Sequence, residues 1–562
     1  MDGNGTVRRN AAAAARPWWK DAVVYQVYPR SFQDADGDGI GDLKGLARRI
    51  PYLADLGVDA LWVCPVYDSP NDDNGYDVRD YRAILPEFGT MADMDDVLGI
   101  CRTHGIRVFM DLVANHTSDE HAWFLESRAS KDSPKRDWYI WRKGRDGGPP
   151  DGLTSHFGGS AWEYDERTGE SYFHLFSRRQ PDLNWENPEV RAAIRDVMRF
   201  WLDRGVSGFR MDAITYLKKD WANAPADGPA AAMCLNKPGL LDFLREMKRE
   251  ALAPYGAATV AEAPGVPAER AMEFIDPDDG VFDLLFTFDH VDLDIAGVPR
   301  GQRRPWDLRT FKRGFTDWEK AAGERGWLAL YLENHDQVRS VSKFGDDGRY
   351  RTESATMLAA WYLLMRGTPF VYQGQELGMA NAPFRTIAEY RDVDALNLHR
   401  EALAAGRSEA EVLRYLAVRG RDHSRTPMQW SGAPNAGFTD GTPWIAANPD
   451  CLTVNAEREA ADPGSVLSFY KRLIRLRRTH PAFVDGTFEE ILADSQALGG
   501  YLRTLGPARF AVVCNFTAAS QPLPDLPALR GMRRVLGNAR SGAPDALGPY
   551  ETRVLGTAPT TD

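Results

Sequence analysis

Short apolar runs alternate with segments of helical periodicity from Trp18 onward. Such runs, rich in β-branched and aromatic residues and bounded by turn residues, are typical of buried parallel strands. The segment 189–205 shows the complementary pattern, since its apolar residues recur at helical spacing and it ends on a glycine. The runs that fit the strand pattern are 22–28, 59–65, 106–113, 208–213, 258–263, 282–288, 328–334 and 368–374. Eight strand–helix units in succession predict an α/β fold, a (β/α)₈ TIM barrel.

Two connections are too long to be plain loops, and both follow the carboxyl end of a predicted strand, where barrels of this kind carry their active sites. The first is an inserted subdomain after strand 3, and the second is an excursion after strand 8. A helix near 463–480 is followed by short alternating strands, which predict a C-terminal all-β sandwich domain. The predicted divisions are a disordered leader (1–16), the barrel (17–113 and 189–480), the inserted subdomain (114–188), the excursion (375–460) and the C-terminal domain (485–562).

Net charge and cysteine content limit the classes of function that the chain can have. The chain has 562 residues and a net charge of −12, which argues against a general nucleic-acid binder. The five cysteines are scattered and form no paired motif, so we expect free thiols in a reducing, cytoplasmic compartment. Neither a signal peptide nor a membrane span is expected, since no stretch is long and apolar enough. The sequence leaves a monomer and a homodimer open.

Charged residues gather where the predicted strands end. Alternation along a strand places Arg210 and Asp212 on one face, where burial of both charges is costly unless they are paired or used. The full set is Asp111, His116, Arg210, Asp212, Glu262, His335 and Asp336. Carboxylates that converge on one barrel face suit glycosidic cleavage by a nucleophile and an acid/base. Asp212 is the candidate nucleophile, because Arg210 would keep it ionised, and the apolar setting of Glu262 would raise its pKa as an acid requires.

Four of these segments carry a resemblance to a known family. DLVANH, GFRMDAIT, AEAPG and ENHDQ resemble the conserved regions of the α-amylase superfamily, glycoside hydrolase family 13. More narrowly, the chain is similar to the oligo-1,6-glucosidase and α-glucosidase subfamily from Trp18 to about residue 555. The supporting stretches are WWKDAVVYQVYPRSFQDADGDGIGDLKG, SPNDDNGYDVRDY, HLFSRRQPDLNWENPEVR and RGRDHSRTPMQW.

The resemblance implies a role for each matching residue. Asp212 would be the nucleophile, Glu262 the acid/base and Asp336 the stabiliser of the transition state. Asp77 and Arg421 would form a charge pair that closes the pocket behind the non-reducing glucose, which implies an exo-acting enzyme. The other implied substrate-binding residues are His116, Phe157, Phe176, Gln180, Arg210 and His335.

The loop DADGDGIGD places acidic residues at alternate positions among glycines, a spacing that suits Ca²⁺. It is not an EF-hand, because the twelfth position is Gly45 rather than glutamate. The resemblance implies a structural calcium here. The implied ligands are Asp34, Asp36, Asp38, Asp42 and the carbonyl of Ile40.

Three functions remain open at this point. The sequence favours a retaining exo-α-glucosidase acting on a small oligosaccharide or disaccharide. A sucrose isomerase or transglucosylase on the same fold is the second, although such isomerases carry an arginine-rich motif where this chain has HVDLD (290–294). A non-catalytic member is the third, although members of that kind lack part of the catalytic set.

The residue after the nucleophile bears on the linkage. In the subfamily, valine there accompanies α-1,6 substrates, and alanine or threonine accompanies α-1,4 substrates. Ala213 therefore favours α-1,4 bonds, as in maltose and maltooligosaccharides, with the α-1,6 specificity of an oligo-1,6-glucosidase as the alternative.

Overall fold

The computed structural model describes residues 16–145, 148–539 and 543–557, and eight parallel strands at its centre close into a barrel. Neighbours around the barrel follow the order β1, β15, β14, β13, β12, β10, β5 and β2. The strands are β1 (Val24–Val27), β2 (Ala60–Val63), β5 (Arg107–Val113), β10 (Gly208–Asp212), β12 (Ala258–Glu262), β13 (Leu284–Phe286), β14 (Leu328–Leu330) and β15 (Thr368–Tyr372). Each lies inside one of the eight predicted runs, so the barrel prediction is confirmed.

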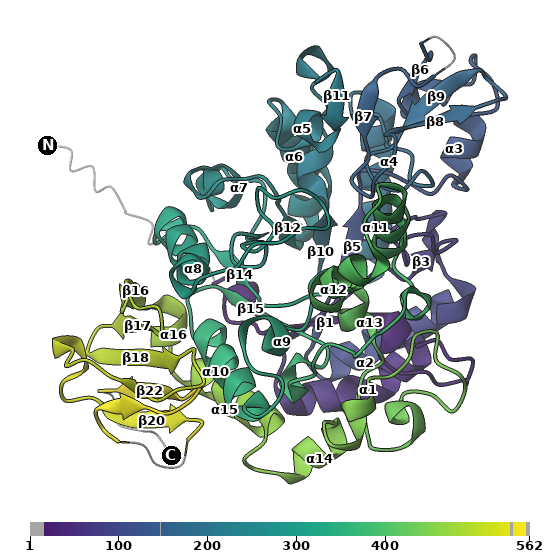
Figure 1. Cartoon of the computed structure of the whole chain (residues 1–562). Coiled ribbons are helices and arrows are strands. Elements are labelled where there is room, and N and C mark those ends of the chain that lie inside the picture. Colours follow the sequence, from purple (N-terminus) through teal and green to yellow (C-terminus); the bar gives the residue numbers. More distant parts are fainter. Residues whose placement is uncertain (1–15, 146–147, 540–542, 558–562) are drawn as a thin grey trace, which may run out of the picture.

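Helices surround the strands and complete the eight units (Figure 1). They are α1 (Leu43–Leu56), α2 (Met91–Thr103), α4 (Pro188–Asp203), α6 (Leu240–Met247), α7 (Ala271–Ile275), α8 (Leu308–Ala322), α10 (Arg351–Leu363) and α15 (Val466–Thr479). Helix α4 shows why the sequence pattern was informative. Asn187 caps its first turn, and Val190, Ile194 and Trp201 form a buried stripe at helical spacing.

The apolar core has two layers that the barrel wall separates. Val24, Trp62, Phe109 and Phe370 belong to a cluster that fills the interior, whereas a larger cluster packs between the strands and the helices. Register then decides which polar groups meet inside, since Arg210 of β10 lies directly opposite Asp111 of β5. The barrel therefore holds charged side chains at its carboxyl end, above an apolar floor.

The inserted subdomain lies between β5 and α4 and contains α3 (Ala122–Ser127) with a three-stranded antiparallel sheet. The strands of this sheet are β6 (Trp141–Arg142), β9 (Glu170–Phe173) and β8 (Trp162–Asp165). A further strand, β7 (Gly152–Thr154), pairs in parallel with β11 (Asp227–Pro229) from the connection after β10. The sequence did not reveal β11, because three residues containing glycine and proline carry no strand pattern.

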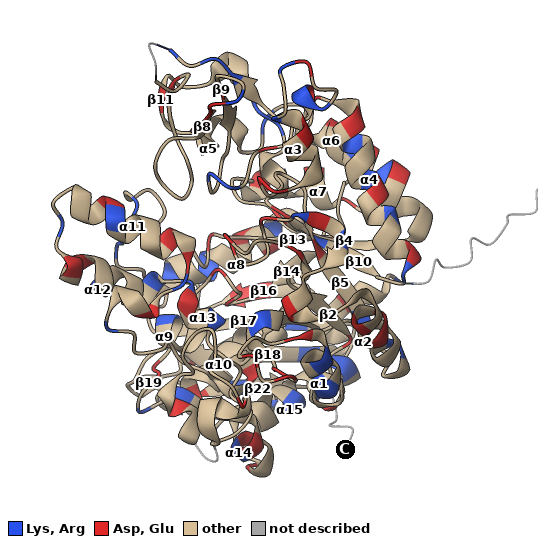
Figure 2. Ribbon diagram, turned by 90° about the vertical axis from the view of Figure 1, so that its right-hand side faces the viewer, with Lys and Arg blue, Asp and Glu red and all other residues tan. Residues whose placement is uncertain are grey.

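The excursion after β15 supplies four helices: α11 (Val393–Ala404), α12 (Glu409–Arg419), α13 (Asp422–Arg425) and α14 (Ala456–Ala461). Helices α11 and α12 pack against each other and lie below the inserted subdomain in Figures 1 and 2. Short elements fill the remaining connections: β3 (Tyr67–Asp68), β4 (Asp80–Ile84), α5 (Ala231–Cys234), α9 (Ser340–Phe344) and α16 (Ala482–Asp485).

The C-terminal domain is all-β, as predicted. Its five-stranded antiparallel sheet has the order β16, β17, β18, β22 and β20, and a two-stranded sheet of β19 and β21 accompanies it. The strands are β16 (Thr487–Ile491), β17 (Leu498–Leu505), β18 (Ala508–Asn515), β19 (Gln521–Pro522), β20 (Arg533–Gly537), β21 (Ala546–Leu547) and β22 (Thr552–Gly556). Leu498, Val513 and Leu547 join the two sheets, while Tyr501 packs against Trp361 of α10.

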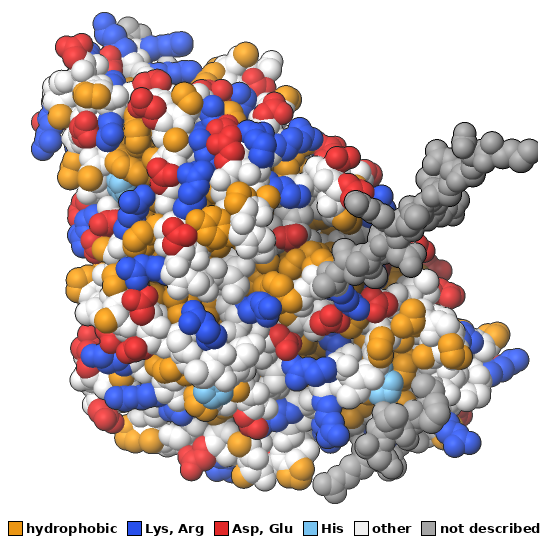
Figure 3. All heavy atoms as spheres, turned by 180° about the vertical axis from the view of Figure 1, so that it is seen from behind, with side chains coloured by type: hydrophobic (Ala, Val, Ile, Leu, Met, Phe, Trp, Pro, Cys, Tyr) orange, Lys and Arg blue, Asp and Glu red, His pale blue; other side chains and the backbone are white. Residues whose placement is uncertain are grey.

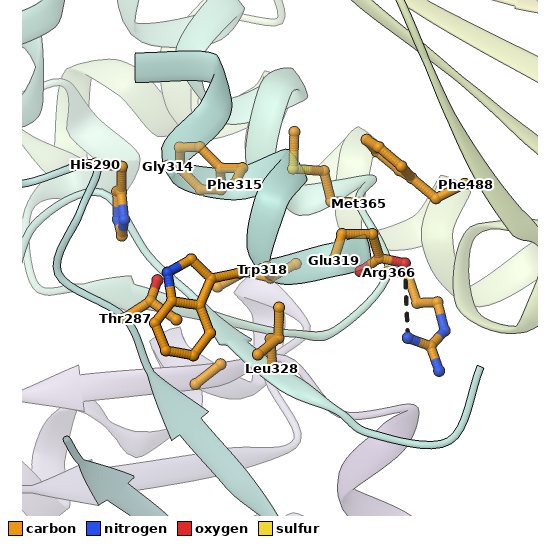
Figure 4. Close-up of a pocket in the computed structure, with 12 residues that line it drawn as sticks. Thr287, His290, Gly314, Phe315, Trp318, Glu319, Leu328, Met365, Arg366 and Phe488 are labelled. Atoms are coloured by element: carbon orange, nitrogen blue, oxygen red, sulfur yellow. Dashed lines mark ion pairs between the residues drawn. The ribbon is translucent and has the colours of Figure 1, made fainter. Parts of the chain in front are cut away.

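A small void lies behind the barrel, where α8 and strand β16 meet the outer face of β14 (Figure 4). Its volume is about 10 Å³, about enough for one water molecule. Glu319 and Arg366 form an ion pair at its edge, with 3.6 Å between the carboxylate and the guanidinium. The void is therefore a packing defect between layers, too small for a sugar.

The surface carries both signs of charge. Lys, Arg, Asp and Glu alternate along the outer helices in Figure 2 and are interspersed over the rear face in Figure 3. Within the described ranges, no helix combines the length and apolar character that a bilayer crossing needs. Residues 1–15 of the predicted leader lie outside the described residues.

Candidate active site

A cavity of about 360 Å³ opens at the carboxyl ends of the barrel strands. Its lining comes from the ends of β10 and β12, from the connections after β2, β13 and β14, from the inserted subdomain and from the excursion after β15. The predicted site residues among its walls are His116, Phe157, Phe176, Asp212, Ala213, Glu262, Asp336 and Arg421. Arg210, Gln180 and His335 lie directly behind this lining and contact it.

Arg210 is the centre of a buried cluster. One terminal nitrogen lies 2.6 Å from a carboxylate oxygen of Asp111 and 2.6 Å from one of Asp212. The other terminal nitrogen lies 2.8 Å from Glu262, so one guanidinium serves three carboxylates. Trp62 and Tyr76 donate further hydrogen bonds to Asp111, at 2.8 and 3.1 Å. The arrangement holds Asp212 and Glu262 on two adjacent strand ends, facing the same space.

Arg210 acts on Asp212 in the predicted direction, but it is only one of several influences on this carboxylate. Burial raises the pKa of Asp212, against the opposing charge of Arg210, and the neighbouring carboxylates of Glu262 and Asp111 raise it further. Burial also raises the pKa of Glu262, again against Arg210. Three carboxylates that share one cation titrate as a unit, and the raised pKa values of Asp212 and Glu262 favour a proton within the cluster.

Two histidines with lowered pKa values belong to the site, His116 in the lining of the cavity and His335 behind it. Burial lowers the pKa of His116 to about 4 and that of His335 to about 3. His335 meets the side chain of Gln26 at 2.9 Å and a carboxylate oxygen of Asp336 at 3.2 Å. Tyr76 stacks on the His335 ring, with 5.1 Å between ring centres and an angle of 7°. Neutral imidazoles in fixed orientations suit hydrogen bonds to sugar hydroxyls.

A second charged cluster closes the opposite wall. Arg421 contacts Asp392 at 2.5 Å, Asp336 at 3.0 Å and Asp73 at 3.4 Å. Arg425 adds a contact of 2.9 Å to the same oxygen of Asp336. Although burial acts to raise the pKa of Asp336, the positive charges of Arg421 and Arg425 outweigh it and hold that pKa well below its usual range. Asp336 is therefore a fixed anion.

The predicted pairing of Asp77 with Arg421 is wrong. Asp77 is fully buried, and its carboxylate accepts hydrogen bonds from the Ser69 hydroxyl and from the backbone amides of Asp72 and Asp73. The partner of Arg421 in this segment is Asp73, four residues earlier. Asp77 organises the NDDNGYD turn through backbone bonds, and the turn directs Asp73 into the cavity.

The remaining predicted pocket residues come together as a wall of the inserted subdomain. The rings of Phe157 and Phe176 are 5.7 Å apart, and Phe176 lies 5.1 Å from His116. Gln180 donates to Asp73 at 3.1 Å and meets His116 at 3.1 Å. This wall therefore joins apolar faces to hydrogen-bonding groups, a combination typical of sugar-binding sites.

Ala213 has an unusual backbone for a residue with a side chain. Its φ of 44° lies in the left-handed region, where a β-branched residue is strained. This conformation directs its backbone N–H to Glu262, with 2.9 Å from nitrogen to oxygen. The residue after the candidate nucleophile thereby orients the candidate acid/base directly.

Several residues of the cavity were missed at the level of sequence. They are Asp73, Tyr76, His156, Tyr216, Asp292, Asp392 and Asp394, with Arg425 behind them. Asp73 and Tyr76 belong to the same NDDNGYD stretch that drew attention to Asp77, so the motif was found and the position within it was mistaken. Asp392 and Asp394 lie in the long excursion, where no pattern distinguishes them.

The predicted calcium loop gathers three of its carboxylates. Asp34, Asp36 and Asp42 each place an oxygen within 4.8 Å of the others, a donor set that fits Ca²⁺. Asp38 is exposed and lies outside this group. The loop also fastens the excursion, since Thr439 donates to Asp34 at 2.5 Å and Trp444 donates to the carbonyl of Gly39 at 3.0 Å. The Ile40 carbonyl remains a prediction.

Taken together, the cavity has what acetal cleavage requires. A proton-holding carboxylate cluster faces a fixed anion across a space of disaccharide dimensions, with aromatic and neutral polar groups between them. Such a site can protonate a leaving oxygen, attack an anomeric carbon and stabilise positive charge on a sugar ring.

Comparisons with known proteins agree with this chemistry. A model described as the alpha amylase catalytic domain matches residues 26–486. An oligo-1,6-glucosidase of Parageobacillus thermoglucosidasius is 50% identical over 510 residues, covering 89% of this chain and 91% of that protein. A trehalose-6-phosphate hydrolase of Bacillus subtilis is 43% identical over 516 residues, with coverage of 91% and 92%. The solved structure of an isomaltulose synthase of Erwinia rhapontici with sucrose is 40% identical and has a TM-score of 0.92, with coverage of 97% and 99%.

Proposed function

The chain belongs to the α-amylase family, glycoside hydrolase family 13, and from that premise we propose that it is a retaining, exo-acting α-glucosidase. It releases glucose from the non-reducing end of short α-glucosides and prefers α-1,4 bonds. Family membership makes it a glycosidase. The retaining mechanism, the exo mode and the linkage preference are the proposal.

The reaction assigns one role to each carboxylate. The Asp212 carboxylate attacks the anomeric carbon, while Glu262 transfers its proton to the glycosidic oxygen and the C–O bond breaks. Water, deprotonated by Glu262, then cleaves the glucosyl–Asp212 ester and restores both groups. Asp336, held as an anion, stabilises the positive charge that develops on the ring. Contact of Asp212 and Glu262 with one guanidinium supports the short carboxyl separation of a retaining enzyme.

The observation that supports exo-acting cleavage is the closed end of the cavity. Arg421 bridges Asp73, Asp336 and Asp392 there, so a sugar chain has no space to continue behind the glucose. Initial rates with p-nitrophenyl α-glucoside and maltotetraose test this proposal. Glucose with the retained α configuration is the expected first product. Release of maltose or longer fragments from the start would contradict it.

The linkage preference rests on Ala213, which lines the cavity beside Asp212 and Glu262. A methyl side chain leaves room for the second sugar of an α-1,4 substrate. In Ala213→Val, the added methyl groups should lower the ratio of kcat/KM for maltose over isomaltose by about tenfold. An unchanged ratio in a folded variant would refute the steric argument.

A second candidate is α-1,6 specificity, because several relatives are oligo-1,6-glucosidases at 43–50% identity. A third is isomerisation of sucrose, since isomaltulose synthases share the fold closely. Rates on maltose, isomaltose and sucrose, with all products resolved, separate the three. Accumulation of isomaltulose or trehalulose from sucrose would identify an isomerase.

We also infer a structural Ca²⁺ at Asp34, Asp36 and Asp42, where it would join the loop to the excursion.

Five buried cysteines without disulfide bonds support the expected cytoplasmic location. Cell fractionation of the native host tests the location directly.

A further inference from the structure

Arg300 connects three regions of the chain above the cavity. It lies in the connection between β13 and α8, and its guanidinium faces helix α11. One terminal nitrogen donates to Glu401 at 2.7 Å. The other pairs with the carboxylate of Asp394 and donates to the backbone carbonyl of Phe157 in the inserted subdomain at 3.3 Å. The planar fork of arginine can serve several acceptors at once, which a lysine cannot reproduce.

Other contacts hold the segment of Phe157 and Gly158 against helix α11. The side-chain amide of Asn397 donates to the Phe157 carbonyl at 3.2 Å, so this oxygen accepts from two residues outside its own subdomain. Gly158 packs so closely against α11 that a Cβ there would lie 2.0 Å from a carboxylate oxygen of Glu401. We call this set of contacts the mouth bridge: Arg300 pairs with Asp394 and Glu401, and Arg300 and Asn397 both donate to the Phe157 carbonyl.

The mouth bridge spans two walls of one cavity. Phe157 lines it from the inserted subdomain, and Asp394 lines it from the excursion. The Phe157 ring also lies under the guanidinium of Arg421, at 5.1 Å, which links the bridge to the closed glucose end. Because that end is closed, the leaving part of a substrate has to extend toward the mouth.

From this placement we propose that Arg300 is a positioning and specificity-determining residue. By fixing Phe157 against α11, it sets the width of the cavity mouth and restricts the enzyme to short substrates. The inference rests on the proposed exo-glucosidase function and deepens it by naming the residue that limits chain length.

The exposure of the ion pairs in the mouth bridge indicates that Arg300 affects the choice of substrate rather than the stability of the fold. The Arg300 side chain is 31% exposed and its two carboxylate partners are 35% and 40% exposed. Ion pairs at such exposure contribute little to global stability. Loss of the bridge should therefore leave the fold intact and change only the wall that Phe157 forms.

The test compares Arg300→Ala with the wild-type enzyme on a disaccharide and a tetrasaccharide of the linkage that the wild type cleaves. Arg303→Ala is the matched control, since Arg303 lies three residues away, is exposed and has no ion pair within the described residues. Thermal unfolding is recorded for each variant. Arg300→Lys tests the geometry, because one ammonium group cannot reach all three acceptors.

In Arg300→Ala, we expect KM for the disaccharide to rise several-fold with kcat within twofold. The ratio of kcat/KM for the tetrasaccharide over the disaccharide should rise about fivefold or more. Arg300→Lys should give an intermediate shift, and Arg303→Ala none. Gly158→Ala, which displaces Glu401 and strains a backbone with a φ of 90° while the Arg300 side chain is kept, should shift the ratio in the same direction.

Two results would overturn the inference. One is a chain-length ratio within twofold of wild type in both Arg300→Ala and Gly158→Ala. The other is an equal loss on both substrates that accompanies a lower melting temperature, which would make the bridge merely structural. A wild-type enzyme that cleaves no α-glucoside would instead refute the proposed function, and the inference with it.

Discussion

Two clusters of charged side chains face each other across the cavity, and they differ in the ratio of carboxylates to guanidinium groups. In the Arg210 cluster, Asp111, Asp212 and Glu262 share one arginine. In the Arg421 cluster, the carboxylates of Asp73, Asp336 and Asp392 share two, since Arg425 also contacts Asp336 and Asp392. Both clusters are buried in the same site.

The two clusters differ in the number of arginines per carboxylate, and this difference assigns proton transfer to one cluster and substrate binding to the other. Burial raises the pKa values of Asp212 and Glu262, and a single arginine does not offset it. Burial also acts on Asp336 and Asp392, but there the arginines outweigh it and their pKa values are lowered. One wall can therefore hold and release a proton, whereas the carboxylates of Asp336 and Asp392 stay ionised.

The largest expected effect separates the two reactive members of the Arg210 cluster. Asp212→Asn removes the attacking carboxylate, so kcat should fall by roughly 10⁴-fold or more on every substrate. Glu262→Gln removes the proton, so maltose hydrolysis should fall comparably while p-nitrophenyl α-glucoside, whose leaving group needs no proton, loses much less in its first step. Burst kinetics with both substrates measure this. Equal losses for the two variants on both substrates would contradict the assigned roles.

Removal of a cation from the second cluster should have the next largest effect. Arg421→Ala leaves Asp73 without its ion pair and Asp392 with only Arg425. We expect kcat/KM for p-nitrophenyl α-glucoside to fall by roughly 10²- to 10³-fold, since the carboxylates that position the glucose lose the cation that holds them in place. Arg385→Ala, an exposed arginine of the same excursion, is the control. A loss below tenfold would show that Arg421 does not close the glucose site.

The pH dependence of KM should distinguish Asp73 from Asp77. Burial raises the pKa of Asp73 to about 7, so the ionised form that accepts sugar hydroxyls is lost as the pH falls through that value. KM should then rise by up to about tenfold for each pH unit below 7. Asp73→Asn should have a high KM without this dependence. Asp77→Asn should retain it, because Asp77 lies outside the cavity; a flat profile in Asp77→Asn would restore the sequence-based pairing.

The smallest effect on turnover should come from the predicted calcium loop, which lies outside both clusters. Chelation should lower the melting temperature by about 2–3 °C, through loss of roughly 2–3 kcal/mol of binding free energy, with little change in kcat. Asp36→Asn should lower the melting temperature and abolish the response to chelator, whereas Asp38→Asn should preserve both, because only Asp36 belongs to the three-carboxylate group. A melting temperature that is insensitive to chelation would refute the calcium site.

The barrel and its catalytic strand ends could be predicted because both depend on local pattern. The run that contains β10 is buried throughout, yet includes Arg210 and Asp212, which only a charged barrel end explains. The NDDNGYD stretch shows the limit of this reasoning. Sequence identified the turn, but whether Asp73 or Asp77 reaches Arg421 depends on the path of the backbone through left-handed Asn74 and Gly75.

The sequence by itself determined the eight-stranded barrel, the three candidate catalytic carboxylates and the calcium-type loop, since each is encoded by residues close together in the chain. Only the tertiary structure decided which carboxylates share which arginine, that β11 joins the inserted subdomain, and that Arg300 holds Phe157 against α11. Those contacts join segments far apart in sequence. Their geometry depends on how the elements pack and on which of several charged groups pairs with a given partner. Neither can be predicted from a local sequence pattern.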